Sequence, residues 1–125
     1  MMPLILDDKA RESLEAAERL LQDDEGRECL PNAVTNRAYY AAYLAVAHVA
    51  QRLHVPFTDG RKYYRHDMLP DLARRRGFLG VQDAIALHWL LSQRVMADYT
   101  DESVDFDDAN KAVETAKLLL ERLIP

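Results

Sequence analysis

The sequence predicts an all-α protein, an antiparallel up-and-down bundle of four long helices and one short helix in a single domain, residues 1–125. Three observations favour this fold. The chain has only four glycines and five prolines, and it is rich in alanine and leucine, which have high helix propensity. Apolar residues recur every three or four positions in four long segments, whereas no segment alternates apolar and polar residues as a half-buried strand does.

The first helix is expected over residues 7–23, with Asp7 or Asp8 as its cap, because aspartate accepts hydrogen bonds from the free amides of a first turn. Gly26 follows the helix and can take the left-handed conformation in which helices commonly end. Steps of four, three and four residues give this helix one apolar stripe, made of Ala10, Leu14, Ala17 and Leu21.

The second helix is expected to run from Pro31–Asn32 to Leu53, because proline suits a first turn and Pro56 disfavours a longer helix. One apolar stripe follows its length, and Tyr39 and Tyr43 belong to a second apolar face. A helix that is apolar on more than one side must be covered on more than one side. We therefore expect this helix to be the centre of the bundle and to lie close to a contact between two copies of the chain.

Residues 54–66 hold proline, glycine and aspartate and are expected to form a loop. A short helix over residues 67–76 follows, and its basic last turn before a glycine is typical of a helix end. The fourth helix is expected over residues 81–98, and the last one begins after Asp105, whose side chain can cap it. One side of the fourth helix is expected to carry Ala84, Leu87, His88, Leu91 and Val95.

Cysteine and histidine usage predicts neither disulfides nor bound metal. The single cysteine, Cys29, excludes an internal disulfide framework and fits a reducing compartment. No two histidines have the spacing of metal ligands on a helix, so no metal and no cofactor are expected, and the roles of His48, His54 and His88 stay open.

Targeting signals are not expected either. The first eight residues lack the basic region of a signal peptide, and no apolar run approaches the ~20 residues of a membrane span. We therefore expect a cytoplasmic chain without a membrane partner.

A basic segment interrupts an acidic chain. The formal net charge is −5, yet residues 52–76 carry seven Lys and Arg against three acids. This distribution suits one local anionic ligand better than a general coat for nucleic acid. The stretch "RKYYRH" mixes bases with aromatic residues, and its candidate ligand-binding residues are Arg61, Lys62, Arg65 and His66. The alternative is an ordinary solvated loop.

Arg94 and Asp98 lie one helical turn apart in the stretch "SQRVMADYT". An arginine in otherwise apolar surroundings is costly unless its charge is paired. Arg94 therefore either forms an ordinary ion pair with Asp98 or binds an acid or a phosphate through two hydrogen bonds. Arg37, which precedes the apolar run of the second helix, has the same need and is the expected neighbour of Arg94.

Two stretches, "NRAYYAAYLAVAHVA" over residues 36–50 and "RVMADY" over residues 94–99, resemble the HEPN domain superfamily and its small single-domain prokaryotic branch. The resemblance covers the whole chain in helix order and loop placement. It implies a helical bundle that commonly forms homodimers. Many members are metal-independent ribonucleases, often toxins paired with a minimal nucleotidyltransferase. Their site has an arginine followed a few residues later by a histidine, and two copies of the site face each other across the dimer.

Arg94 matches the arginine of that site, but no histidine follows it, and Asp98 and Tyr99 occupy the region where the histidine would stand. The resemblance therefore favours an RNA- or nucleotide-associated binding or regulatory module, a homodimer that pairs with a nucleotidyltransferase-type protein or with RNA. One alternative is a metal-independent endoribonuclease toxin of a toxin–antitoxin pair, with Asp98 and Tyr99 in place of the histidine. The other is a structural interaction module. Whether the chain is an enzyme stays open.

Two sets of candidate residues follow. The catalytic candidates are Arg94, Asp98 and Tyr99. The ligand-binding candidates are Arg37, Tyr40, Arg61, Lys62, Arg65 and His66.

Overall fold

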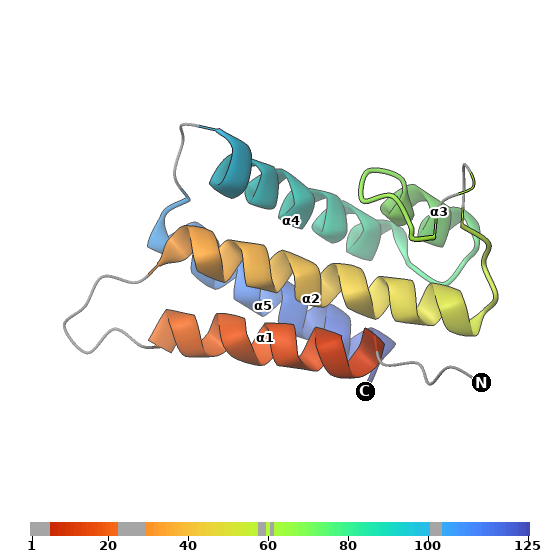
Figure 1. The fold of residues 1–125 in the computed structure, drawn as a ribbon, viewed down its shortest axis with the longest axis horizontal. Coiled ribbons are helices and arrows are strands. Elements are labelled where there is room, and N and C mark those ends of the chain that lie inside the picture. The colour runs from red at the N-terminus through yellow and green to blue at the C-terminus, as the bar shows by residue number, and fades with distance from the viewer. Residues whose placement is uncertain (1–5, 23–29, 58–59, 61, 101–103) are drawn as a thin grey trace.

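The computed structural model describes residues 6–22, 30–57, 60, 62–100 and 104–125, and within them every regular element is a helix. The helices are α1 (Leu6–Gln22), α2 (Pro31–Arg52), α3 (Leu69–Arg75), α4 (Val81–Tyr99) and α5 (Phe106–Leu123). The four long helices alternate in direction along the chain, with α2 between α1 and α4 and with α5 behind it (Figure 1). The predicted all-α bundle of four long helices and one short helix is confirmed.

α2 is the central helix, as its two apolar faces predict, because it contacts each of the other four helices. Its buried residues include six alanines, whose short side chains allow neighbouring helices to approach on several sides: Ala38, Ala41, Ala42, Ala45, Ala47 and Ala50. Tyr39 and Tyr43 are only 1% and 8% exposed within one chain. Their burial therefore gives no argument for a contact between copies at α2. Neither α2 nor any other helix in the described part of the chain could span a membrane.

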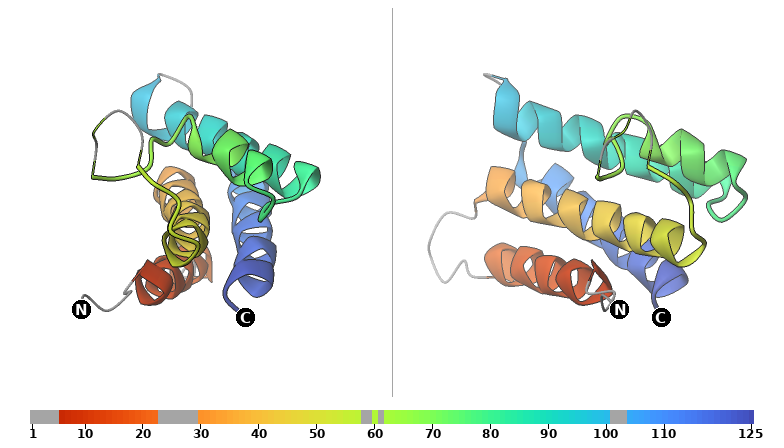
Figure 2. Two further views of the ribbon diagram at one scale, coloured as in Figure 1. Left: turned by 90° about the vertical axis from the view of Figure 1, so that its right-hand side faces the viewer. Right: turned by 45° about the vertical axis from the view of Figure 1, so that its right-hand side comes forward.

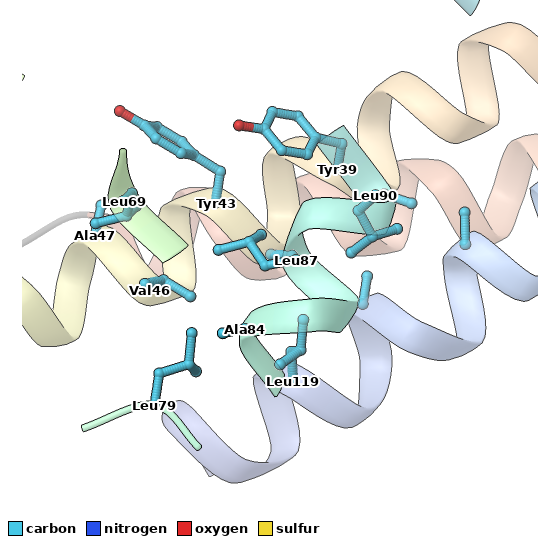
Figure 3. Packing of buried hydrophobic residues seen from close by; sticks show 14 of the residues in the cluster. Tyr39, Tyr43, Val46, Ala47, Leu69, Leu79, Ala84, Leu87, Leu90 and Leu119 are labelled. Carbon is cyan, nitrogen blue, oxygen red and sulfur yellow. The ribbon is translucent and has the colours of Figure 1, made fainter. Parts of the chain in front are cut away.

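The core between α2, α4 and α5 has a polar edge. Leu87 and Leu90 of α4 and Leu119 of α5 are almost fully buried in it. The rings of Tyr39 and Tyr43 lie beside this aliphatic layer, and their hydroxyl groups point in the same direction, away from it (Figure 3). The two tyrosines thus place their polar hydroxyl groups at the edge of this apolar core.

The buried side of α4 differs in part from the expected one. Ala84 and Leu87 are buried as predicted, but His88 and Val95 are exposed, and Leu90 is buried in their place. The physical reason is that apolar residues surround most of α4, so spacing alone fits two neighbouring stripes. The buried stripe, continued by one turn from Leu90, leads to position 94.

The helix limits agree with the predicted ones within two residues, which is the usual scatter at fraying ends. α1 begins at Leu6, so Asp7 and Asp8 lie in its first turn rather than before it. Asp105 caps α5 as predicted, because its Oδ1 accepts a hydrogen bond from the Asp108 amide at 2.8 Å. The predicted helix end at Gly26 and the isolated Cys29 lie outside the described residues.

Candidate functional site

Arg94 lies near the end of α4 on the side that faces α2, and its side chain is only 13% exposed. Its Nη2 donates hydrogen bonds to the hydroxyl oxygens of Tyr40 and Tyr99, each at 3.1 Å. Its Cζ also lies 5.6, 5.2 and 5.3 Å from the ring centroids of Tyr39, Tyr40 and Tyr99. A cation within about 6 Å of an aromatic face is attracted by the ring quadrupole, so the three rings stabilise the buried charge.

Asp98 supplies the negative charge, but it does not use the full hydrogen-bonding capacity of Arg94. Its Oδ2 lies 3.3 Å from Arg94 Nε and accepts a hydrogen bond from Asn36 Nδ2 at 2.7 Å. Arg94 Nε is nevertheless buried without a well-aligned hydrogen bond among the described residues. Because a guanidinium carries five N–H donors, Arg94 can still bind oxygen atoms of an anionic ligand.

His66 joins this site from the segment between α2 and α3. Its Nδ1 lies 2.5 Å from the hydroxyl oxygen of Tyr39, and its ring packs against Tyr43 with centroids 4.2 Å apart. Burial, and then the positive charge of Arg94, lower the pKa of His66 below its ordinary value of 6.5, while Asp67 opposes this shift. A neutral imidazole therefore sits next to the arginine at neutral pH. The name Arg94 cluster is used below for Asn36, Tyr39, Tyr40, His66, Arg94, Asp98 and Tyr99.

Buried tyrosines hold the segment that carries His66. The hydroxyl group of Tyr43 donates to the carbonyl oxygen of Tyr64 at 2.6 Å, and the hydroxyl group of Tyr64 donates to the carbonyl oxygen of Val55 at 2.5 Å. Burial raises the pKa of Tyr43 to about 12 and raises the pKa of Tyr39 still further. These phenols therefore stay protonated, and their hydrogen bonds fix the path of the chain from α2 to α3.

The HEPN domain family matches residues 5–124, a span that includes all five helices and every member of the Arg94 cluster. The chain belongs to the HEPN domain family. A search of curated proteins gave no match.

Within this HEPN domain, Tyr40 and Asn36 take the place that the sequence suggested for Arg37. Asn36 and Tyr40 are four residues apart and share the face of α2 that meets Arg94. Arg37 is one residue further along than Asn36, about 100° around the helix, and lies on the side toward α1. The three catalytic candidates Arg94, Asp98 and Tyr99 do come together.

The other ligand-binding candidates of the HEPN domain lie in separate places. Arg65 donates two hydrogen bonds to the carboxylate of Asp67, at 3.1 and 2.8 Å. Lys62 lines a small cavity of about 180 Å³ formed by α2, Leu6 of α1 and the chain that follows α2. Arg61 lies outside the described residues. Among the described candidate residues of the basic segment, His66 is thus the one that belongs to the Arg94 cluster.

The remaining histidines of the HEPN domain stand apart from the cluster. His48 is buried in α2, and its Nδ1 has no hydrogen-bond partner in the described part of the chain. His54 is exposed and has a φ of 57°, a left-handed conformation at the end of α2. His88 faces solvent with Nε2 3.6 Å from a carboxylate oxygen of Asp71. Over the described ranges, no three His, Cys, Asp or Glu side chains converge as metal ligands would.

Proposed function

We propose that this HEPN domain binds RNA and that Arg94 holds a backbone phosphate in the Arg94 cluster. The observation that carries the proposal is a guanidinium that is only 13% exposed, with Nε 3.3 Å from Asp98 but without a well-aligned hydrogen bond, and with Nη2 on two neutral hydroxyl groups. Arginine binds phosphate through two charge-assisted hydrogen bonds, which are stronger when water is excluded. Tyr99 is 68% exposed beside it, and an exposed aromatic ring can stack on an unpaired base.

Replacing Arg94 by glutamine is expected to weaken RNA binding about tenfold or more, which corresponds to at least ~1.4 kcal/mol. Fluorescence anisotropy with a labelled single-stranded RNA at fixed salt measures the dissociation constant, and circular dichroism checks that helicity is unchanged. The matched control is Arg122→Gln, which removes an exposed arginine of α5 that pairs with Asp83 outside the cluster. Equal losses in both variants, or no binding by the unaltered protein, would overturn the proposal.

A second candidate function is metal-independent RNA cleavage, and the position of His66 favours it. The family histidine is absent after Arg94, but a neutral imidazole reaches the same cluster from another segment. A neutral imidazole can accept the proton of a ribose 2′-hydroxyl, and an arginine can stabilise the charge that develops on the phosphate. Asp98 is a weaker candidate for the base, because Arg94 and Asn36 both hold its carboxylate.

A homodimer is also part of the proposal, through the outer face of α4 rather than through α2. Four apolar residues on this face are exposed by 41% or more: Val81, Ile85, Val95 and Tyr99. Their spacing puts them on one stripe of the helix. A second copy that covers Val81, Ile85 and Val95 would bring the two Arg94 clusters toward each other and leave the ring of Tyr99 open to RNA. Pairing with a nucleotidyltransferase-type protein in a toxin–antitoxin module stays a prediction, which co-purification of the two proteins tests.

The dimer predicts that Ile85→Glu yields a monomer, because a carboxylate buried at an apolar contact is costly. Light scattering at micromolar concentration should give the mass of two chains for the unaltered protein and of one chain for the variant. Leu118→Glu, on the exposed side of α5, is the control and should leave the mass unchanged. A monomeric unaltered protein would contradict the dimer.

A further inference from the structure

A groove with a volume of about 640 Å³ lies between α1 and α2, next to the Arg94 cluster. Asn36 and Tyr40 line both the groove and the cluster, since one bonds to Asp98 and the other to Arg94. A ligand held at Arg94 can therefore continue into the groove. The end-on view shows α1 next to α2 (Figure 2).

Two cations that line this groove have no partner among the described residues. Lys9 of α1 and Arg37 of α2 are exposed, and neither side chain forms a hydrogen bond or an ion pair with any of the described residues. Glu12 is the single acid among the described lining residues, so these residues carry an excess of positive charge in a chain whose formal net charge is −5. Excess positive charge in a groove attracts an anionic ligand.

The two cations also follow one another along the groove. Ser13 Oγ donates a hydrogen bond to the carbonyl oxygen of Arg37 at 2.8 Å, which places Arg37 opposite Ser13. Lys9 is four residues before Ser13, or about 6 Å along α1. The charges are thus spaced along the helices as repeated contacts to one extended chain require.

We propose that this groove holds the continuation of the single-stranded RNA whose phosphate lies on Arg94, with Arg37 and Lys9 each contacting a further phosphate. The inference rests on the proposed RNA binding and adds the path of the strand. Asn36 and Tyr40 form the boundary that the strand crosses between the two sites.

The test is the salt dependence of binding to a labelled single-stranded RNA decamer. Each phosphate contact on a single strand adds about 0.7 to the negative slope of log K against log salt concentration. Lys9→Gln and Arg37→Gln should each weaken binding and reduce the steepness of that slope by about 0.7, and the double variant by about 1.4. The control Lys117→Gln removes an exposed charge on α5 and should leave the slope unchanged. Polyglutamate of equal length should compete poorly.

The outcomes separate the groove from the Arg94 site. If Arg94→Gln loses affinity but both groove variants keep the full slope, the groove inference is overturned and RNA binding stands. If Lys117→Gln reduces the slope as much as the groove variants do, or if polyglutamate competes as well as RNA, general charge attraction explains the binding and the groove inference is overturned. Absence of decamer binding by the unaltered protein overturns the proposed function itself, and the groove inference with it.

Discussion

Leu90→Ala is expected to lower the free energy of unfolding by about 2–5 kcal/mol, because it removes a fully buried side chain and leaves a cavity. Small domains are stabilised by only about 5–15 kcal/mol, so the variant should lose a large part of its stability. Leu90 also stands one turn before Arg94 on the same side of α4, against α2. Loss of this contact should therefore loosen the part of the helix that positions Arg94.

The matched control is Leu118→Ala in α5, where the side chain is 51% exposed. Both changes replace leucine by alanine within a helix, so the difference in helix propensity is the same. An exposed substitution of this kind should change stability by about 0.5 kcal/mol or less. Urea unfolding followed by circular dichroism measures both values. Similar losses in the two variants would contradict the packing of α4 against the core.

The sequence predicts the helices of this domain well because each long helix repeats the same three- and four-residue spacing of apolar residues over several turns. The centre of the bundle was predictable for the same reason, since α2 carries apolar residues on two faces. Spacing alone does not identify the buried face of α4, because its apolar residues extend around most of the helix. For this reason Leu90 is buried although it lies outside the expected stripe, and Val95 is exposed although it belongs to that stripe. Periodicity predicts a helix, but a nearly continuous apolar surface does not select one stripe.

Part of the Arg94 cluster follows the same local logic. Arg94 and Asp98 are four residues apart, so their pairing needs no knowledge of the fold. Asn36 was missed, although its spacing of four from Tyr40 places both on one face of α2. A polar residue at the edge of an apolar face is a weak signal, since most such residues only meet water.

The contact between His66 and the cluster could not be predicted from sequence patterns. His66 precedes Arg94 by 28 positions and belongs to an irregular segment, in which no periodicity relates neighbouring residues in space. Its place depends on the hydrogen bonds of Tyr43 and Tyr64 to backbone carbonyl groups. Without the fold, the stretch around His66 reads only as a basic aromatic loop.

His66→Asn is expected to lower the rate of RNA cleavage by about 10²–10⁴, the usual contribution of a general base, while RNA affinity stays nearly unchanged. In the proposed step, Nε2 of His66 accepts the proton of the 2′-hydroxyl as the 2′-oxygen attacks the adjacent phosphorus. The bond from phosphorus to the 5′-oxygen breaks, and that oxygen takes a proton from water. The products are a 2′,3′-cyclic phosphate and a free 5′-hydroxyl group, and cleavage should persist in EDTA.

Asparagine is the informative substitution because its side-chain amide can keep a hydrogen bond to Tyr39 while it lacks a basic nitrogen. For His66 to act as the base, Nδ1–H must donate to the Tyr39 oxygen, which leaves the lone pair on Nε2. The control His88→Asn replaces an exposed histidine of α4 outside the cluster and should cleave normally. Full activity in His66→Asn would exclude His66 as the base and leave RNA binding at Arg94 intact.

The pH dependence supplies an independent test of His66. Only the neutral imidazole can accept a proton, so kcat/KM should rise with pH and then become constant. Burial and the charge of Arg94 lower the pKa of His66, so the midpoint of the rise should lie below 6.5. An NMR titration of the free protein should give the same low pKa for His66. In Arg94→Gln that pKa should increase, because a neighbouring positive charge that disfavours protonation has been removed. A His66 pKa at or above 6.5, unchanged by Arg94→Gln, would contradict the arrangement in which the arginine keeps its histidine neighbour neutral.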